Sequence, residues 1–178
     1  QSLKDYDLEK LVLQTLQFLA AKGMITGTEA QQNHAYILEV IKVLRERVKT
    51  LAELADASVY FFKDITDYEE KGKEKYFAQE DVETLLSKAK ESLAVVESFD
   101  VENTEKAYRD LIEELQIKSG RLIHPTRLAL TGRTVSPGLF DVMVVLGKER
   151  CLKRLEQAIR FIKTYKSEKE ILEKEILS

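Results

Sequence analysis

The sequence has very little of what stabilises a disulfide-rich or membrane-bound protein. Cys151 is its single cysteine, so no intramolecular disulfide can form, and the composition suits a reducing compartment. Wholly apolar runs extend for only a few residues, far short of the roughly 20 that cross a bilayer. The N-terminal stretch QSLKDYDLEK lacks the pattern of a secretory signal. We therefore expect a cytoplasmic protein that makes no use of a membrane.

Helix breakers are also scarce. The 178 residues include 7 glycines, 2 prolines and no tryptophan, and strict alternation of apolar and polar residues is rare, so we predict an all-α fold without a sheet. A hydrophobic content of 44% is enough for one large helical domain or two small ones. Because the chain begins at Gln1 and enters helical sequence at once, we expect it to be part of a longer protein.

Amphipathic periodicity predicts where the helices lie. The apolar residues recur at helical spacing within residues 8–19, 37–48, 82–96, 108–115 and 152–162. A further helix is predicted to begin at Thr50, since Thr50 and Glu53 have the spacing of a capping box. The stretch TGTEAQQN, residues 26–33, is expected to be a loop, and residues 64–80 a connection between subdomains.

Glycines and prolines mark the remaining boundaries. Gly120 is predicted to end the helix over residues 108–115, and Pro125 and Pro137 to open two short helices that Gly132 and Gly147 close. The last helix becomes highly charged in KSEKEILEKEILS, residues 166–178, whose end is expected to fray.

Charge is distributed unevenly along the chain. The net charge is only -3, but residues 64–116 carry sixteen acidic against seven basic residues, whereas residues 117–164 carry three against ten. Such asymmetry is typical of a protein that binds a polyanion. The alternative is that the helix surfaces simply differ in sign and face water.

The stretch LTGRTVSPGLF, residues 130–140, concentrates turn residues between two apolar helices. A helix N-terminus capped by Ser136 would present free amides to phosphates or base edges, and Arg127 and Arg133 flank it. Arginine can hydrogen-bond a base or stack on it, which suits unpaired RNA. The alternative is that Gly132, Ser136 and Pro137 only mark where helices end and begin, and that both arginines face solvent.

Catalytic and metal chemistry find little support. His34 and His124 are far apart, and no spacing of His, Cys or carboxylates is typical of metal ligands. A nucleophilic pair of Cys151 and His124 would require the fold to bring them together.

The same region carries a family resemblance. HPTRLALTGRTVSPGLFDVMVVLGKERCLKRLEQAI, residues 124–159, resembles the C-terminal domain of bacterial glutamyl-tRNA synthetases, with their P-x-R-x-A-L-T-G-R-x-x-S-P-G-L-F pattern. LRERVKTLAELADASVYFF, residues 44–62, and residues 8–25 are similar to segments of the same enzymes. The resemblance implies two small helical subdomains, 1–70 and 71–178, that form an anticodon-binding cage. It also implies a class I catalytic domain elsewhere, because no H-I-G-H motif is present, so this chain alone should not activate glutamate.

The resemblance also implies the partner and the site residues. The partner would be tRNA(Glu), read through its anticodon loop by a monomer, with ATP and Mg²⁺ bound in the parent catalytic domain and no cofactor in this chain. Arg127 would contact an anticodon base, and Arg47 the first anticodon base, where the family separates glutamate from glutamine anticodons. Ser136, Pro137 and Leu139 would pack against anticodon bases. Supporting contacts would come from Lys49, Thr131, Arg133 and Lys148.

Three alternatives stay open at this point. The parent enzyme could be a relaxed synthetase that also charges tRNA(Gln), or a class I lysyl enzyme with a related helical cage. From a different class, the chain could be a free-standing helical module that binds a protein partner.

Overall fold

The computed structural model describes residues 3, 7–26, 28 and 33–178. This part of the chain is helical and contains no strand, which confirms the predicted all-α fold. Most of the predicted loop at residues 26–33 lies outside the described residues. None of the described helices combines the length and the apolar character that bilayer crossing demands.

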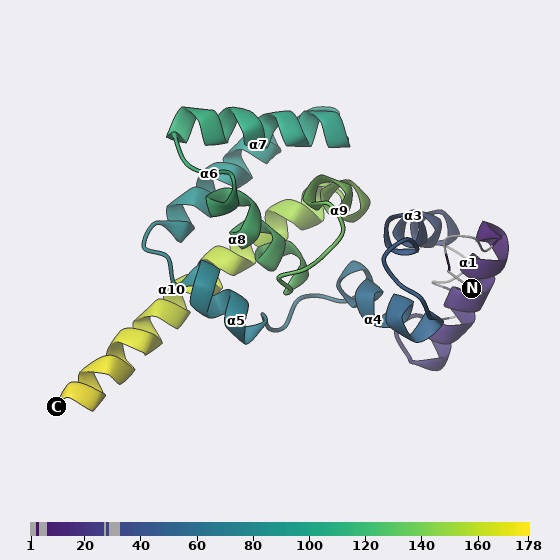
Figure 1. The fold of residues 1–178 in the computed structure, drawn as a ribbon, viewed down its shortest axis with the longest axis horizontal. Helices are drawn as coiled ribbons and strands as arrows, with labels where there is room; N and C mark the ends of the chain where they lie inside the picture. The colour runs from purple at the N-terminus through teal and green to yellow at the C-terminus, as the bar shows by residue number, and fades with distance from the viewer. Residues whose placement is uncertain (1–2, 4–6, 27, 29–32) are drawn as a thin grey trace.

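Three helices form a cluster at the N-terminal end of the chain (Figure 1): α1 (Leu8–Ala21), α3 (His34–Leu44) and α4 (Leu51–Phe62), each packed on the other two. α3 ends at Leu44, earlier than the predicted range to residue 48, because the chain turns at residues 45–49. The predicted capping box is present. Thr50 Oγ1 accepts from the Glu53 amide at 3.1 Å, and the Glu53 carboxylate accepts from the Lys49 amide at 2.7 Å.

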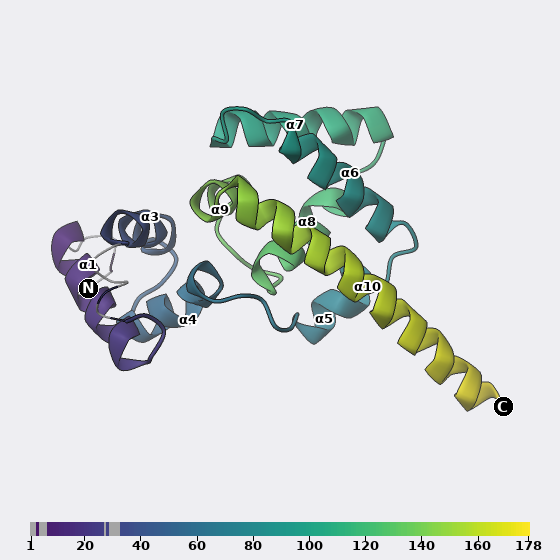
Figure 2. The same ribbon diagram turned by 180° about the vertical axis from the view of Figure 1, so that it is seen from behind.

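The other helices form a larger bundle around the last one (Figures 1 and 2). α10 (Lys148–Leu177) packs on α6 (Val82–Ala94), α8 (Gly120–Thr131) and α9 (Leu139–Leu146), while α7 (Val101–Leu115) packs on α6 and α9. Tyr108 and Phe77 are the largest side chains fully buried in this bundle. The predicted division into 1–70 and 71–178 stays a prediction.

Two boundary predictions around residues 116–125 are wrong. α7 ends at Leu115, and the chain leaves it through Gln116 in the left-handed conformation, φ 53°. Gly120 therefore begins α8 instead of ending α7, and Pro125 lies inside α8 instead of opening it. Pro125 has no amide to donate to the Arg121 carbonyl, so α8 lacks one helical hydrogen bond at this position. Gly132, φ 75°, does end α8, and Gly147, φ 86°, ends α9, as predicted.

The predicted connection over residues 64–80 is non-helical only at its two ends, residues 64–69 and 78–80. Residues 64–69 are non-helical, and they are followed by a short helix α5 (Glu70–Gly72) and a π-helical turn η2 (Lys73–Phe77). Phe77 is fully buried and its ring packs 4.9 Å from that of Tyr68. This segment is therefore part of the bundle core.

Two arginines of α10 tie the N-terminal cluster to the bundle. Arg154 is buried and donates to the carbonyls of Leu130, at 2.7 Å, and Lys63, at 3.2 Å. Arg150 donates to the Phe61 carbonyl at 3.0 Å. These bonds occupy carbonyls at the C-terminal ends of α4 and α8, which have no partner within their own helices.

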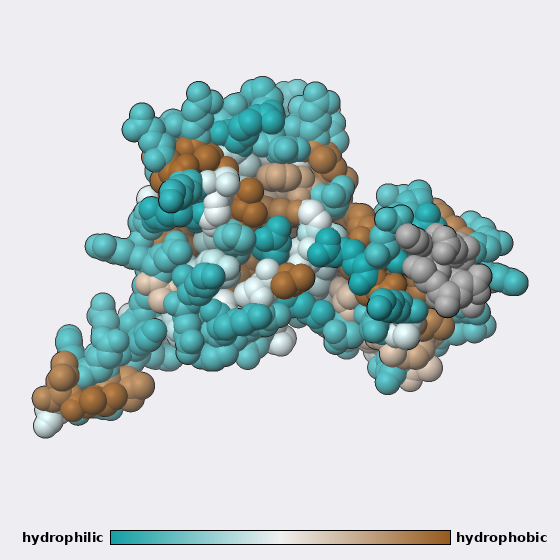
Figure 3. Space-filling model, in the orientation of Figure 1, coloured by the Kyte–Doolittle hydropathy of each residue, from teal (hydrophilic) through white to brown (hydrophobic). Residues whose placement is uncertain are grey.

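The far end of α10 projects from the bundle as a continuous helix (Figures 1 and 2), although fraying was expected there. Its exposed apolar side chains form the brown patch at the tip in Figure 3: Ile171, Leu172, Ile176 and Leu177.

Candidate nucleic-acid interface

The loop of residues 132–138 is docked against the segment that precedes α5. The Gly132 carbonyl accepts from the Glu69 amide at 2.9 Å, and the Thr134 hydroxyl donates to the Glu69 carboxylate at 2.8 Å. A Cβ at residue 132 would lie 2.9 Å from the Asp67 carbonyl oxygen. The loop thus has a fixed position at the end of α8, and only glycine permits so close an approach.

Arg127 points from α8 toward this loop. Its Nε donates to Ser136 Oγ at 3.0 Å, and that hydroxyl donates in turn to the Pro137 carbonyl at 2.7 Å. The prediction that Ser136 caps the next helix is therefore wrong: α9 begins at Leu139, its N-cap is Gly138, and no side chain caps it. Arg127 fixes the loop with one edge of its guanidinium. Within the described residues, its Nη2 makes no hydrogen bond to the protein.

Arg133 connects the loop to the N-terminal cluster. Its Nη2 donates to the Asp56 carbonyl of α4 at 2.6 Å, and its guanidinium lies 5.5 Å from the centre of the Tyr60 ring. The Thr131 hydroxyl accepts from the Arg133 amide at 3.0 Å and donates to the Arg127 carbonyl at 2.7 Å. The Thr131 hydroxyl is thus occupied by backbone groups at the end of α8, and Arg133 has a partner and does not simply face solvent.

Three arginines from different parts of the chain act electrostatically on Tyr60. The ring is 4% exposed, and burial raises the pKa of its hydroxyl to about 12, against the opposing fields of Arg133, Arg47 and Arg127. Arg47 is exposed in the turn between α3 and α4. Burial and the charge of Arg47 both lower the pKa of Arg127. The fold therefore brings the charge of Arg47 near Arg127 and Tyr60, although Arg47 and Arg127 are remote in sequence.

The remaining predicted site residues are placed less favourably for a direct contact. Pro137 and Leu139 are buried, so they hold the loop against the core. Lys49 is exposed beside Arg47 in the same turn. Lys148 is not brought to this face: its ammonium donates to the Val96 carbonyl at 2.8 Å, and α9 separates it from the loop. The role of each of these residues toward RNA stays a prediction.

Sequence reasoning missed one part of this face, the aromatic pair of Tyr76 and His124. The Tyr76 ring stacks on the His124 ring with centres 5.0 Å apart and an interplanar angle of 20°. His124 Nδ1 lies 3.5 Å from Arg127 Nη1. A signal was available, because Lys75 and Tyr76 form a basic and aromatic pair. The prediction that residues 64–80 are a connection does not use this pair.

The structure does not bring Cys151 and His124 together as a nucleophilic pair. Cys151 is buried in α10 and its thiol donates to the Met143 carbonyl at 3.5 Å, whereas His124 stacks on Tyr76. Among the described residues, no cluster of His, Cys, Asp and Glu could hold a metal ion.

Comparison with known proteins assigns this arrangement to a family. The anticodon binding domain family matches residues 8–159. The chain is 51% identical over 160 residues to glutamate–tRNA ligase 2 of Thermoanaerobacter pseudethanolicus, covering 90% of this chain and 33% of that protein. It is 49% identical over 160 residues to glutamate–tRNA ligase 1 of Caldanaerobacter subterraneus, with the same coverage.

Solved structures show the same fold. A glutamate tRNA ligase from Elizabethkingia meningosepticum, solved in complex with its amino acid, superposes with a TM-score of 0.78 at 22% identity, over 90% of this chain and 30% of that one. The chain thus spans about a third of the length of the curated relatives it matches. On the extent of the family match, the chain belongs to the anticodon binding domain family, and the relatives named above are glutamate–tRNA ligases.

Proposed function

We propose that this chain is the region of a bacterial glutamate–tRNA ligase that binds the anticodon loop of tRNA(Glu). In the parent enzyme it would position the tRNA so that its acceptor end reaches a catalytic domain outside this chain, where ATP and Mg²⁺ would act in the attachment of glutamate. The parent would work as a cytoplasmic monomer. The observation that carries the proposal is the oriented guanidinium of Arg127, bonded to Ser136, with Arg133 over the Tyr60 ring and the charge of Arg47 acting on Arg127 and Tyr60.

The chemistry of this face suits unpaired RNA. Arg127 donates from Nε to Ser136, and its Nη2 has no protein partner among the described residues. The guanidinium is therefore oriented before a base binds. A guanidinium held in one orientation can hydrogen-bond a base edge with little further loss of side-chain conformational entropy. Arg47 is exposed and free to reach a second base or a phosphate. Lys49 beside it would add affinity that weakens with salt.

The experiment is a titration of the chain with an anticodon stem-loop of tRNA(Glu), at two salt concentrations, against a stem-loop with a substituted anticodon. We expect selective binding that weakens with salt. Arg127→Ala should lower the affinity for the cognate loop about 10-fold or more, because a good arginine–base pair is worth about 1–3 kcal/mol. Arg109→Ala is the matched control, since Arg109 is exposed on α7.

The alternatives make different predictions in the same titration. A relaxed synthetase would bind stem-loops of tRNA(Glu) and tRNA(Gln) equally, and Arg47→Ala would change neither. A lysyl enzyme would prefer a tRNA(Lys) stem-loop. A free-standing protein-binding module would show no dependence on the anticodon, and that result would contradict the proposed function.

A further inference from the structure

The segment that carries Tyr76 is held rigidly against α8. Besides the Glu69 bonds to the loop, Gly72 approaches α8 so closely that a Cβ there would lie 2.9 Å from the Leu128 methyl carbons. The same Cβ would lie 3.0 Å from the Thr134 methyl. This contact lets η2 lie directly on α8, next to the helical turn that bears His124.

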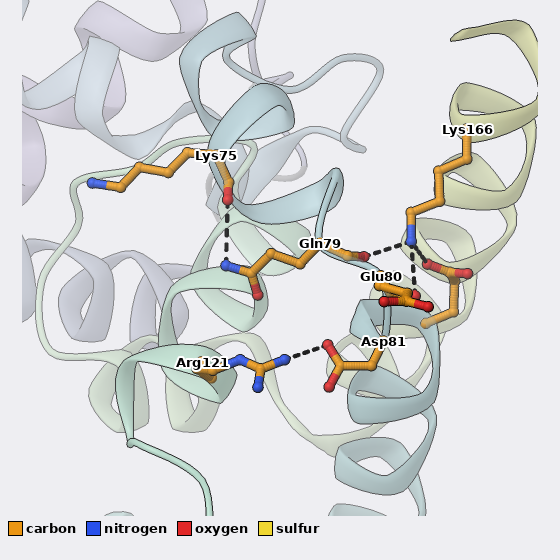
Figure 4. A network of polar contacts seen from close by, with 7 residues as sticks. Lys75, Gln79, Glu80, Asp81, Arg121 and Lys166 are labelled. Carbon is orange, nitrogen blue, oxygen red and sulfur yellow. Dashed lines mark hydrogen bonds and ion pairs between the residues drawn. The ribbon is translucent and has the colours of Figure 1, made fainter. Parts of the chain in front are cut away.

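A polar network fixes the C-terminal side of the same segment (Figure 4). The Gln79 side chain donates to the Lys75 carbonyl at 3.3 Å, and the Lys166 ammonium from α10 donates to the Gln79 carbonyl at 2.5 Å. Arg121 of α8 pairs with Asp81. The backbone that presents Tyr76 is thus attached to both α8 and α10.

The two rings lie at the surface of the bundle. His124 lies over Gly120, where a Cβ would be 3.1 Å from the imidazole Cδ2, so the absence of a side chain at residue 120 accommodates the ring. Phe77, the neighbour of Tyr76, is fully buried, whereas Tyr76 is half-buried and His124 is exposed. The Lys75 ammonium lies 5.5 Å from the centre of the Tyr76 ring. A stacked aromatic pair with a cation beside it is therefore accessible at the surface.

We propose that the Tyr76–His124 pair is a stacking platform for an unpaired nucleobase of the bound RNA, placed beside Arg127 so that one base can stack and its edge can meet the guanidinium. This inference rests on the proposed function and adds a binding element to it. Stacking tolerates any base, since every base has a π-face, so the platform supplies affinity while Arg127 supplies discrimination. Lys75 is positioned to neutralise the adjoining phosphate.

The chemistry of His124 suits this role. Burial, followed by the charges of Arg127 and Lys75, lowers the pKa of the imidazole from its usual value. This lowering favours the uncharged imidazole, which stacks on Tyr76 as an aromatic surface and does not repel the two neighbouring cations.

The test is a titration of the whole chain with the same anticodon stem-loop across a series of salt concentrations. Tyr76→Leu should weaken binding between about fivefold and a hundredfold, while Tyr76→Phe, which keeps the ring, should bind as tightly as the unchanged chain. The slope of log affinity against log salt should be the same in both variants, because neither removes a charge, whereas Lys75→Ala should make it shallower. Stacking also predicts quenching when an unpaired loop base is replaced by 2-aminopurine, and loss of that quenching in Tyr76→Leu.

The chain offers a matched control in Tyr165. Its ring also stacks on a neighbour, Phe161, with centres 5.9 Å apart, and a lysine, Lys169, also lies 5.6 Å from its centre, but it lies on α10. Tyr165→Leu should leave binding unchanged. The platform is overturned if Tyr76→Leu binds the loop as tightly as the unchanged chain while Arg127→Ala binds it weakly, a result that would leave the proposed function standing. If the unchanged chain does not distinguish the cognate loop at all, both proposals fail.

Discussion

Arg150 of α10 and Tyr36 of α3 donate to the same acceptor, the Phe61 carbonyl at the end of α4, at 3.0 and 2.6 Å. The guanidinium also lies 4.9 Å from the centre of the Tyr36 ring. One carbonyl thus joins three helices, and a cation–π contact reinforces the junction. With Arg154 one turn further along α10, this junction sets how the Arg47 turn stands relative to Arg127.

Arg154→Met should destabilise the fold by about 2–4 kcal/mol, because the carbonyls of Leu130 and Lys63 would lose their donor while the volume is kept. Urea unfolding followed by circular dichroism measures this change. Arg160→Met, on an exposed position of the same helix, should stay within about 0.5 kcal/mol of the unchanged chain. Equal effects of the two substitutions would contradict the role assigned to Arg154.

Gly132→Ala should cost more stability than Gly23→Ala, although both glycines have a left-handed φ, 75° and 70°. The strain of that conformation, about 1–2 kcal/mol, is common to both. Only at residue 132 would the new methyl also meet a backbone oxygen, at 2.9 Å, whereas nothing lies within 4 Å at residue 23. The same urea titration should show a difference of at least about 1 kcal/mol, the usual cost of overpacking, and identical losses would mean that the loop can shift away.

Cys151 should resist thiol reagents in the folded protein. Burial raises the pKa of its thiol to about 12, so almost none is thiolate at pH 8. Labelling with a chromogenic disulfide should therefore require unfolding, and its rate should increase with denaturant. A small thiol such as glutathione serves as the reactive reference. Complete labelling of the native chain at the rate of that reference would show that the interior of the bundle opens readily.

The pKa of His124 should lie below the usual 6.5 and should rise when its neighbours are removed. Burial is the larger cause and the charges of Arg127 and Lys75 follow, so Tyr76→Leu and Arg127→Ala should each raise it. NMR titration of the imidazole proton measures this directly. Because the folded state holds this proton less tightly than the unfolded chain, stability should fall as pH decreases from 6.5 to the folded pKa, and Arg127→Ala should reduce that dependence.

The helices with long apolar stripes could be predicted from sequence, and the short or interrupted ones could not. α1, α6 and the start of α4 follow periodicity and capping signals that are local. The start of α8 was misplaced because a proline near a helix start is compatible with several positions, and Gly120 with either end of a helix. Sequence does not predict η2, because it is five residues long and depends on tertiary contacts with α8.

Only part of the candidate site could likewise be predicted from the sequence. The arginines and the turn residues near residues 127–138 could be identified from local chemistry and a family resemblance. The bond from Arg127 to Ser136, the contact of Arg133 with Asp56 and the stack of Tyr76 on His124 join segments that only tertiary packing brings together. No local pattern contains them, so sequence reasoning assigned Ser136 to a helix cap and overlooked Tyr76.

The continuity of α10 has a mechanical consequence. Arg150 and Arg154 near its start hold the N-terminal cluster, Lys166 near its middle holds the turn after η2, and the eleven helical residues beyond, 167–177, extend about 16 Å further. One rigid helix is thus attached both to the N-terminal cluster and to the turn after η2. A load on its free end would act on both attachments at once, so that tilting α10 would change the spacing between Arg47 and Arg127.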